Sequence, residues 1–217
     1  MGSSTILQDI YDRLFRHFGP QHWWPAESRF EVLVGAILTQ NTNWGNVEKA
    51  LDNLKSIGRL DLTSIAEMPH GLLAEYIRPA GYYNLKAKRL ANLLALITTA
   101  YQGDLELFFA EETAVLREQL LSVKGVGPET ADSILLYACN RPVFVIDAYT
   151  FRILARHGFE LEGWEYAQLQ ELFMDNLPAD AALYNEYHAL LVQVGKDFCK
   201  KNRPHCEGCP LQGVHLS

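Results

Sequence analysis

A pair of glycines and an aspartate are the residues of this chain best suited to bind an anion and act on it. The stretch V-K-G-V-G-P-E-T-A at 123–131 sets Gly125 and Gly127 between two apolar, helix-like segments. Glycine tolerates φ > 0 and leaves backbone N–H groups uncovered, and N–H groups at a helix N-terminus bind phosphate without a cationic side chain. The glycines therefore fit a helix–hairpin–helix phosphate clamp, and on their own they fit a helix C-cap followed by a new helix equally well.

Asp147 follows the extended apolar run V-F-V-I at 143–146 and begins a predicted helix at about 147–157. By position alone its commonest role is that of a helix N-cap. A catalytic role for the same carboxylate can coexist with that cap.

Three cysteines, Cys199, Cys206 and Cys209, are spaced C-x6-C-x2-C near the C-terminal end. The N-terminal residues show no basic region followed by an apolar stretch, so no signal peptide is predicted and we expect a cytoplasmic protein. Disulfides are rare in that compartment. The spacing therefore indicates metal ligation rather than a disulfide.

Four residues could form an aromatic pocket. Trp23 and Trp24 precede Pro25, which disfavours a helical Trp24, and Trp44 follows the turn L-T-Q-N-T-N. They are either a hydrophobic plug between helices or the walls of a binding pocket.

The composition is that of an ordinary globular protein, with 48% hydrophobic and 21% charged residues and a net charge of −7. No apolar run is long enough to span a membrane. Although the net charge is negative, basic residues gather at Lys86, Lys88 and Arg89, and again at Lys196, Lys200, Lys201 and Arg203. Each group is either a solvated helix face or a surface for phosphates.

Apolar residues recur with helical spacing along the whole chain and predict an all-α fold. Expected helices include 62–68, 70–78, 84–101, 112–122, 129–139, 147–157, 165–176 and 180–195. No segment shows convincing strand alternation.

Several separated motifs, in order, resemble the helix-hairpin-helix endonuclease III superfamily of DNA glycosylases, and the chain is closest to the bacterial 3-methyladenine DNA glycosylase III subgroup. F-E-V-L-V-G-A-I-L-T-Q-N-T at 30–42 resembles the first barrel helix and its turn, and A-G-Y-Y-N-L-K-A-K at 80–88 resembles a second hairpin. V-K-G-V-G-P-E-T-A and V-F-V-I-D-A-Y-T-F-R resemble the main hairpin and the catalytic segment. The cysteines resemble the metal loop. The resemblance extends from about residue 30 to 209.

This resemblance implies two helical domains. A six-helix barrel would occupy 27–132 and include most of the hairpin motif, while 1–26 and 133–217 would form a second domain with the metal loop. The active cleft would lie between them, with the hairpin at its mouth.

The resemblance also assigns roles to particular residues. Asp147 matches the catalytic aspartate, which stabilises positive charge developing on deoxyribose. Gln40 matches the side chain that fills the gap left by the flipped nucleotide, and Tyr82 matches a wedge that enters a base step. The implied phosphate-binding hairpin comprises Lys124, Gly125, Val126, Gly127 and Thr130.

Glu129 marks a departure that decides the chemistry. Bifunctional members carry a nucleophilic lysine at this position, and a carboxylate cannot form a Schiff base with C1′. Lysine-dependent AP-lyase activity is therefore not expected, and Glu129 is expected beside the pocket.

In the 3-methyladenine subgroup aromatic residues sandwich the base; Trp44 here stands in place of a phenylalanine. A cationic alkylated purine suits tryptophan, because cation–π attraction contributes about 0.5–2 kcal/mol.

In the resembling family a fourth cysteine completes a [4Fe–4S] site, and here His215 occupies that position. We expect a [4Fe–4S] cluster; a Cys3His zinc site or an empty loop are the alternatives.

The sequence thus predicts a monofunctional DNA glycosylase of base-excision repair that hydrolyses off an alkylated purine, 3-methyladenine first of all. The alternatives are a mismatch glycosylase for adenine or thymine and a non-catalytic helix-hairpin-helix DNA-binding module. The expected partner is double-stranded DNA containing a damaged base, with no membrane contact. We expect a monomer associated with a bacterial-type nucleoid.

Overall fold

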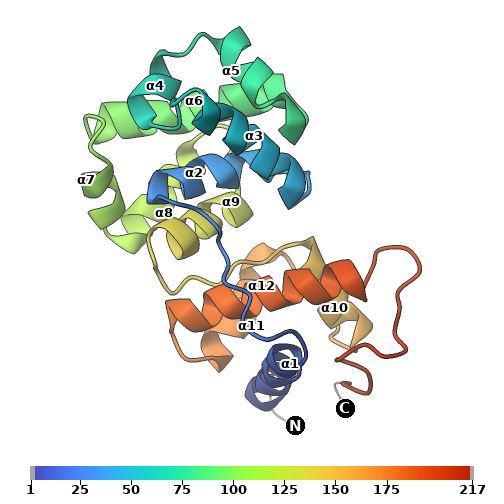
Figure 1. Ribbon diagram of the computed structural model, residues 1–217. Coiled ribbons are helices and arrows are strands. Elements are labelled where there is room, and N and C mark those ends of the chain that lie inside the picture. The colour runs from blue at the N-terminus through green and yellow to red at the C-terminus, as the bar shows by residue number, and fades with distance from the viewer. Residues whose placement is uncertain (1–2, 216–217) are drawn as a thin grey trace. The chain divides into compact units, whose positions relative to one another are not determined.

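The computed structural model describes residues 3–215, which divide into two compact units (Figure 1). One unit is Ala26–Cys139, and the other contains the described residues up to Pro25 and from Asn140 onward. Over this described range all regular structure is helical, which confirms the predicted fold class. The first unit ends at Cys139 rather than at 132 because the segment after the hairpin continues as a buried helical turn.

The Ala26–Cys139 unit is built around α2 (Arg29–Leu38), which Figure 1 shows in the middle of its helices. Every α2 residue after Arg29 is buried. A helix that is apolar nearly all round belongs in a core, and Ser28 starts it by accepting a hydrogen bond from the Glu31 N–H (3.1 Å). The surrounding helices are α3 (Trp44–Ser56), α4 (Leu62–Glu67), α5 (His70–Tyr76), the short 3-10 turn η1 (Arg78–Ala80), α6 (Tyr83–Ala100), α7 (Leu105–Ala110), α8 (Thr113–Ser122), α9 (Pro128–Ser133) and η2 (Ile134–Ala138).

Two details of this unit differ from the sequence expectation. The acidic stretch around Asp104 contains a helix, α7, because Asp104 accepts from the N–H groups of Glu106 and Leu107 and so caps it. The predicted helix 129–139 is α9 followed by η2, a π-helical turn. Arg117 of α8 donates two hydrogen bonds to the buried Asp132 of α9, at 2.7 and 3.0 Å. This bidentate pair fastens the two helices that flank the glycine hairpin.

The second unit contains α1 (Ser3–Phe18), α10 (Ala148–Arg156), α11 (Tyr166–Asn176) and α12 (Ala181–Asp197). Its core is aromatic, with Phe144 stacked on Phe173 at a centroid distance of 4.1 Å. The buried Tyr187 hydroxyl of α12 donates to the carbonyl of Leu7 in α1 (2.8 Å). This bond joins α1 to α12, the first and last of the described helices.

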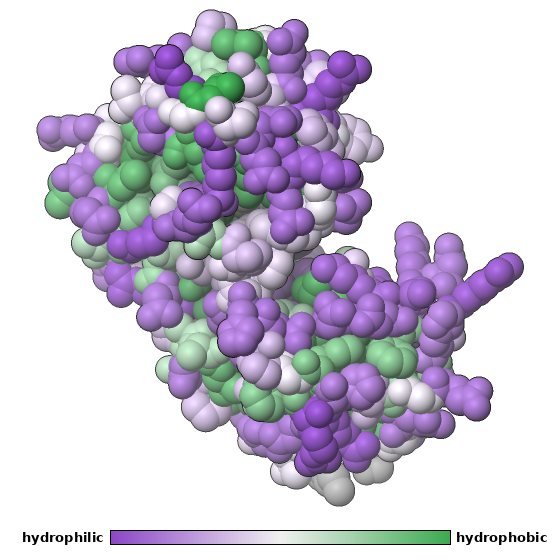
Figure 2. Space-filling view, in the orientation of Figure 1, coloured by the Kyte–Doolittle hydropathy of each residue, from purple (hydrophilic) through white to green (hydrophobic). Residues whose placement is uncertain are grey.

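On the face shown in Figure 2, hydrophilic residues cover most of each unit and hydrophobic residues form small separate patches. None of the helices in residues 3–215 is long and apolar enough to cross a membrane.

Candidate functional site

The glycine hairpin at 123–127 uses its two glycines differently. Gly125 has φ = +100°, and a Cβ there would lie 2.5 Å from Cγ of Arg89. Gly127 has φ = −102° and nothing within 4 Å of such a Cβ, and it is the N-cap residue of α9. Glycine is thus required at 125 for backbone conformation and for space, whereas at 127 it leaves the helix start open.

The other hairpin residues fall into an inward and an outward group. Val126 is buried and its N–H donates to the Val123 carbonyl (3.0 Å), so it holds the turn together. Thr130 is also buried, and its hydroxyl accepts from Gln40 (3.0 Å). Lys124 and Glu129 are exposed. Of the predicted DNA-binding side chains of this hairpin, Lys124 is therefore the one presented to solvent.

Gln40 lies in the turn after α2, and its amide is bonded within the protein. Nε2 donates to the Gly125 carbonyl and to the Thr130 hydroxyl, each at 3.0 Å. Oε1 accepts from Nη1 of Arg89. The Gln40 side chain thus joins this turn to the hairpin and to α6, and its role in filling a gap in DNA stays a prediction.

The basic group after the second hairpin is divided between the interior and the surface. Lys86 is 1% exposed, and its ammonium donates to the carbonyls of Leu38 and Ala80, each at 2.7 Å. Burial, and secondarily the charge of Arg89, lowers the pKa of Lys86 to about 8, so it is still protonated at pH 7. Lys88 is exposed. The interpretation of all three as a solvated or phosphate-facing group is thus wrong for Lys86.

Tyr82 lies at the tip of the second hairpin. It has φ = +47° and is 70% exposed. A left-handed backbone is uncommon for a tyrosine, and the Tyr82 ring is exposed rather than packed. Its position is compatible with the predicted wedge, which stays a prediction.

Asp147 is the N-cap of α10 and uses one carboxylate oxygen for that purpose. Oδ1 accepts from the Thr150 N–H (2.8 Å) and the Thr150 hydroxyl (2.9 Å). Oδ2 lies 3.8 Å from Nε2 of His188, and both side chains are about one-tenth exposed. Burial lowers the pKa of His188 below its ordinary value, against the opposing pull of Asp147. The sequence analysis missed His188, since nothing in the sequence pairs it with a residue so distant along the chain.

The tryptophans are divided between the units. Trp23 and Trp24 are half-buried with ring centroids 5.0 Å apart, and Pro25 beside them is exposed. Trp44 is half-buried at the start of α3, in the other unit. Their joint role around a base stays a prediction.

The predicted metal ligands line one cavity of about 190 Å³ in the second unit, namely Cys199, Cys206, Cys209 and His215. Their side chains are not drawn together: within residues 3–215 no group of three His, Cys, Asp or Glu side chains forms a metal-binding cluster. Burial raises the pKa of the Cys209 thiol. Nη1 of Arg156 donates a hydrogen bond to Cys199 Sγ (3.2 Å). Three thiols, an imidazole and this cation suit a metal or cluster.

Two arginines of α10 tie that helix to the cysteine loop, and the sequence analysis did not identify either of them. Arg152 Nε donates to the Cys199 carbonyl (2.7 Å), and Arg156 Nη1 donates to the Lys200 carbonyl (2.7 Å).

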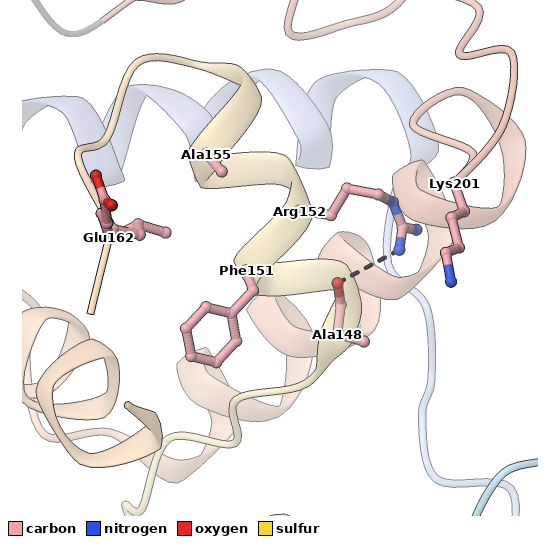
Figure 3. A pocket seen from close by; sticks show the side chains of 7 residues that line it. Ala148, Phe151, Arg152, Ala155, Glu162 and Lys201 are labelled. Carbon is pink, nitrogen blue, oxygen red and sulfur yellow. Dashed lines mark hydrogen bonds between the residues drawn. The ribbon is translucent and has the colours of Figure 1, made fainter. Parts of the chain in front are cut away.

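Arg152 also borders a second hollow of about 660 Å³, where Figure 3 shows its bond to the Ala148 carbonyl. That hollow is lined by the outer face of α10 with Glu162 and Lys201, and none of the predicted catalytic, pocket or metal residues lines it. In the loop itself Lys200, Lys201 and Arg203 are exposed, as a phosphate-facing group would require.

Comparison with known proteins is consistent with this arrangement. Residues 34–179 match the family described as the HhH-GPD superfamily base excision DNA repair protein. A provisionally named DNA repair glycosylase of Methanocaldococcus jannaschii, MJ1434, is 49% identical over 213 residues, covering 98% of this chain and 96% of that protein. The H. pylori 3-methyladenine DNA glycosylase MagIII, solved with 1,N6-ethenoadenine, is 37% identical with a TM-score of 0.76, covering 90% of this chain and 98% of that one. An endonuclease III–DNA complex shares the fold, with a TM-score of 0.83 at 22% identity over 99% of this chain and 96% of that one.

Proposed function

Because this chain belongs to the HhH-GPD superfamily of base excision DNA repair proteins, we propose that it is a monofunctional DNA glycosylase that removes an alkylated purine, 3-methyladenine first of all. The observation that carries the proposal is Asp147, a mostly buried carboxylate with one oxygen fixed by Thr150 and the other directed toward His188. The similarity to MagIII over nine-tenths of the chain supports the alkylpurine substrate.

In the proposed reaction the C1′–N bond of the damaged nucleotide breaks, and its electron pair leaves with the base. Asp147 Oδ2 stabilises the positive charge that develops on the sugar. Water then forms the new bond to C1′, and its proton passes to the carboxylate or to solvent. A 3-methylated adenine is cationic while attached and leaves as a neutral base, so it needs little leaving-group activation.

The absence of a lyase step rests on Glu129. It lies exposed in the first turn of α9, at the position where bifunctional relatives of the resembling superfamily carry the nucleophilic lysine. A carboxylate provides no amine for a Schiff base with C1′. The proposed product is therefore an intact abasic site.

The base would be held between Trp24 and Trp44, with Trp23 and Pro25 supporting the first wall. A cationic purine between indoles gains about 0.5–2 kcal/mol from cation–π attraction when desolvated. Ordinary adenine lacks that charge, so the pocket would select for the alkylated base.

We further propose that the C-terminal loop holds a [4Fe–4S] cluster through Cys199, Cys206 and Cys209, with His215 as fourth ligand. The four donors already line one cavity, and binding would draw them together. The cluster would stiffen the loop that carries Lys200, Lys201 and Arg203, and these cations would then meet DNA phosphates.

One experiment tests the activity. Duplexes that contain 3-methyladenine, an A·G mismatch or a G·T mismatch would be incubated with the protein, and released bases would be identified by mass spectrometry. We expect release from the alkylated duplex alone, and borohydride should trap no protein–DNA adduct. Release from a mismatch duplex would instead identify a mismatch glycosylase, binding without release would indicate a DNA-binding module, and efficient trapping would refute the monofunctional assignment.

A further inference from the structure

Within the second unit, α10 and α12 pack together, and each presents one titratable side chain to the other. Asp147 is the N-cap of α10, and His188 lies on α12. Oδ2 of Asp147 is 3.8 Å from Nε2 of His188, and the two side chains are 11% and 10% exposed. The imidazole therefore borders the carboxylate where both groups are largely shielded from water.

The two carboxylate oxygens of Asp147 are held differently. Oδ1 accepts from the N–H and the hydroxyl of Thr150, at 2.8 and 2.9 Å. These bonds hold Oδ1 at the start of the helix, but they do not fix the direction in which Oδ2 points. That direction depends on the group beside Oδ2, which is the His188 ring.

Packing between the two helices fixes the place of His188. Gly195 lies seven residues after His188, about two helical turns, so both are on the same face of α12. A Cβ at Gly195 would overlap the ring of Tyr149, which α10 presents to it. The Arg152 guanidinium lies 4.7 Å from the centroid of that ring and donates to the Gly195 carbonyl (3.4 Å). The fold thus sets His188 beside Asp147 before any DNA binds.

The charge of His188 decides what it can do for the carboxylate. Burial lowers the pKa of His188, and Asp147 acts in the opposite direction. The carboxylates of α1, which also packs on α12, are Asp9 and Asp12, and after burial they raise the pKa of the neighbouring Tyr187 instead. A protonated imidazole would pair with Asp147 and offset its negative charge. A neutral imidazole with its proton on Nε2 can donate a hydrogen bond and leave that charge intact.

We propose that His188 is a positioning residue that, as a neutral imidazole, donates from Nε2 to Oδ2 of Asp147 and aims that oxygen at the sugar of the flipped nucleotide. This inference rests on the proposed function, because there Asp147 stabilises the positive charge that develops at C1′. The separation of 3.8 Å would shorten to hydrogen-bond length in the DNA complex, as catalytic hydrogen bonds that are long in free enzymes do.

The test compares affinities for two uncleavable duplexes that differ in charge at the sugar. One contains a pyrrolidine abasic analogue, which is cationic, and the other contains the neutral tetrahydrofuran analogue. The ratio of the two affinities reports the negative charge directed at the sugar. We expect the natural protein to prefer the cationic analogue, and Asp147→Asn, the control for the carboxylate, to lose that preference.

Two amide variants of His188 form a matched pair. His188→Gln places an N–H donor where Nε2 stood, whereas His188→Asn places it nearer the backbone, where Nδ1 stood. Neither amide can become charged. We expect His188→Gln to keep the natural ratio, and His188→Asn to lose about tenfold of it, the effect of one hydrogen bond to a charged group.

The pH dependence of the ratio separates positioning from a purely structural role. In the natural protein the ratio should fall as pH drops below the ordinary histidine pKa of 6.5, because a protonated His188 offsets the charge of Asp147. His188→Gln should hold its ratio until the carboxylate itself is protonated. A structural role would instead change Tm and both affinities together, and the two pH profiles of the ratio would coincide.

Equal ratios in the natural protein and both amide variants would overturn the proposal. Coinciding pH profiles for the natural protein and His188→Gln would also overturn it, and that comparison decides the matter if His188→Asn does not fold. A natural protein without any preference for the cationic analogue overturns it as well, while base release reports separately on glycosylase activity. Neither duplex contains a damaged base, so failure of the 3-methyladenine assignment leaves the outcome unaffected.

Discussion

Substituting the two hairpin glycines one at a time would test whether tertiary contacts decide their roles. In Gly125→Ala the new Cβ would lie 2.5 Å from Arg89 Cγ and 2.9 Å from its Cδ, on a backbone with φ = +100°. In Gly127→Ala the methyl group meets nothing within 4 Å, at φ = −102°. The two changes are chemically identical, so a difference between them must come from conformation and packing.

The size of the Gly125→Ala effect follows from two costs. An alanine held at this φ costs about 1–3 kcal/mol in backbone strain. Arg89 must also move, and its charged hydrogen bond to Gln40 contributes about 1.5–3 kcal/mol. Together they lower the free energy of unfolding by about 2.5–6 kcal/mol, which at about 2–4 °C per kcal/mol lowers Tm on the order of 10 °C. Gly127→Ala has two opposing effects. Alanine is a poorer N-cap, which lowers the free energy of unfolding, while the less flexible unfolded chain raises it by about 0.4–1 kcal/mol. Tm should therefore shift by no more than about 3 °C.

Thermal unfolding followed by circular dichroism would measure both variants beside the natural protein. A titration with undamaged duplex DNA would then show whether the loss at Gly125 extends to binding, which we expect because Arg89 also orders the Gln40 turn. Equal Tm values for the two variants, or a lower Tm for Gly127→Ala, would refute the account of Arg89 packed against Gly125.

The other predictions concern the second unit. Asp147→Asn keeps an oxygen that can cap α10 through Thr150, so base release should fall by orders of magnitude while DNA binding and Tm persist; near-normal turnover would reduce Asp147 to a helix cap. Burial lowers the pKa of His188 in the folded protein. As pH falls below about 6.5, His188 is therefore protonated in the unfolded chain before it is protonated in the folded protein, which favours unfolding. The free energy of unfolding should therefore decline from about pH 6.5 downward, and His188→Gln should flatten that decline; an unchanged profile would exclude His188 as its cause. Protein purified without oxygen should contain about four irons per chain, and Cys206→Ser should lose them and weaken DNA binding together. His215→Ala should destabilise the site; stoichiometric zinc, or no metal, would reject the cluster, and full iron content in His215→Ala would reject the imidazole as ligand.

The helices were largely predictable because their signals are local. Apolar spacing marked α6, α8, α10, α11 and α12 to within a few residues, since a helix face is defined by neighbours three and four positions apart. The exception, α7, is short and acidic, and its cap mattered more than its apolar face. Asp147 at a helix start and Glu129 after the hairpin were likewise readable from order along the chain, because both depend on residues close in sequence.

From the sequence alone one could predict the helical fold, the glycine hairpin, the position of Asp147 at a helix start and the family that these motifs indicate. Sequence reasoning treated Gly125 and Gly127 as equivalent, grouped Lys86 with surface cations and assigned the DNA gap to Gln40. Tertiary structure distinguishes the two glycines, because Arg89 packs against Gly125, and it buries Lys86 between two backbone carbonyls. It also bonds the Gln40 amide three times within the protein, while the role of Gln40 in DNA stays a prediction. Those partners lie far away in sequence, or on another helix. Whether a polar side chain faces solvent or the interior depends on which distant groups satisfy its hydrogen bonds, and no local pattern encodes that.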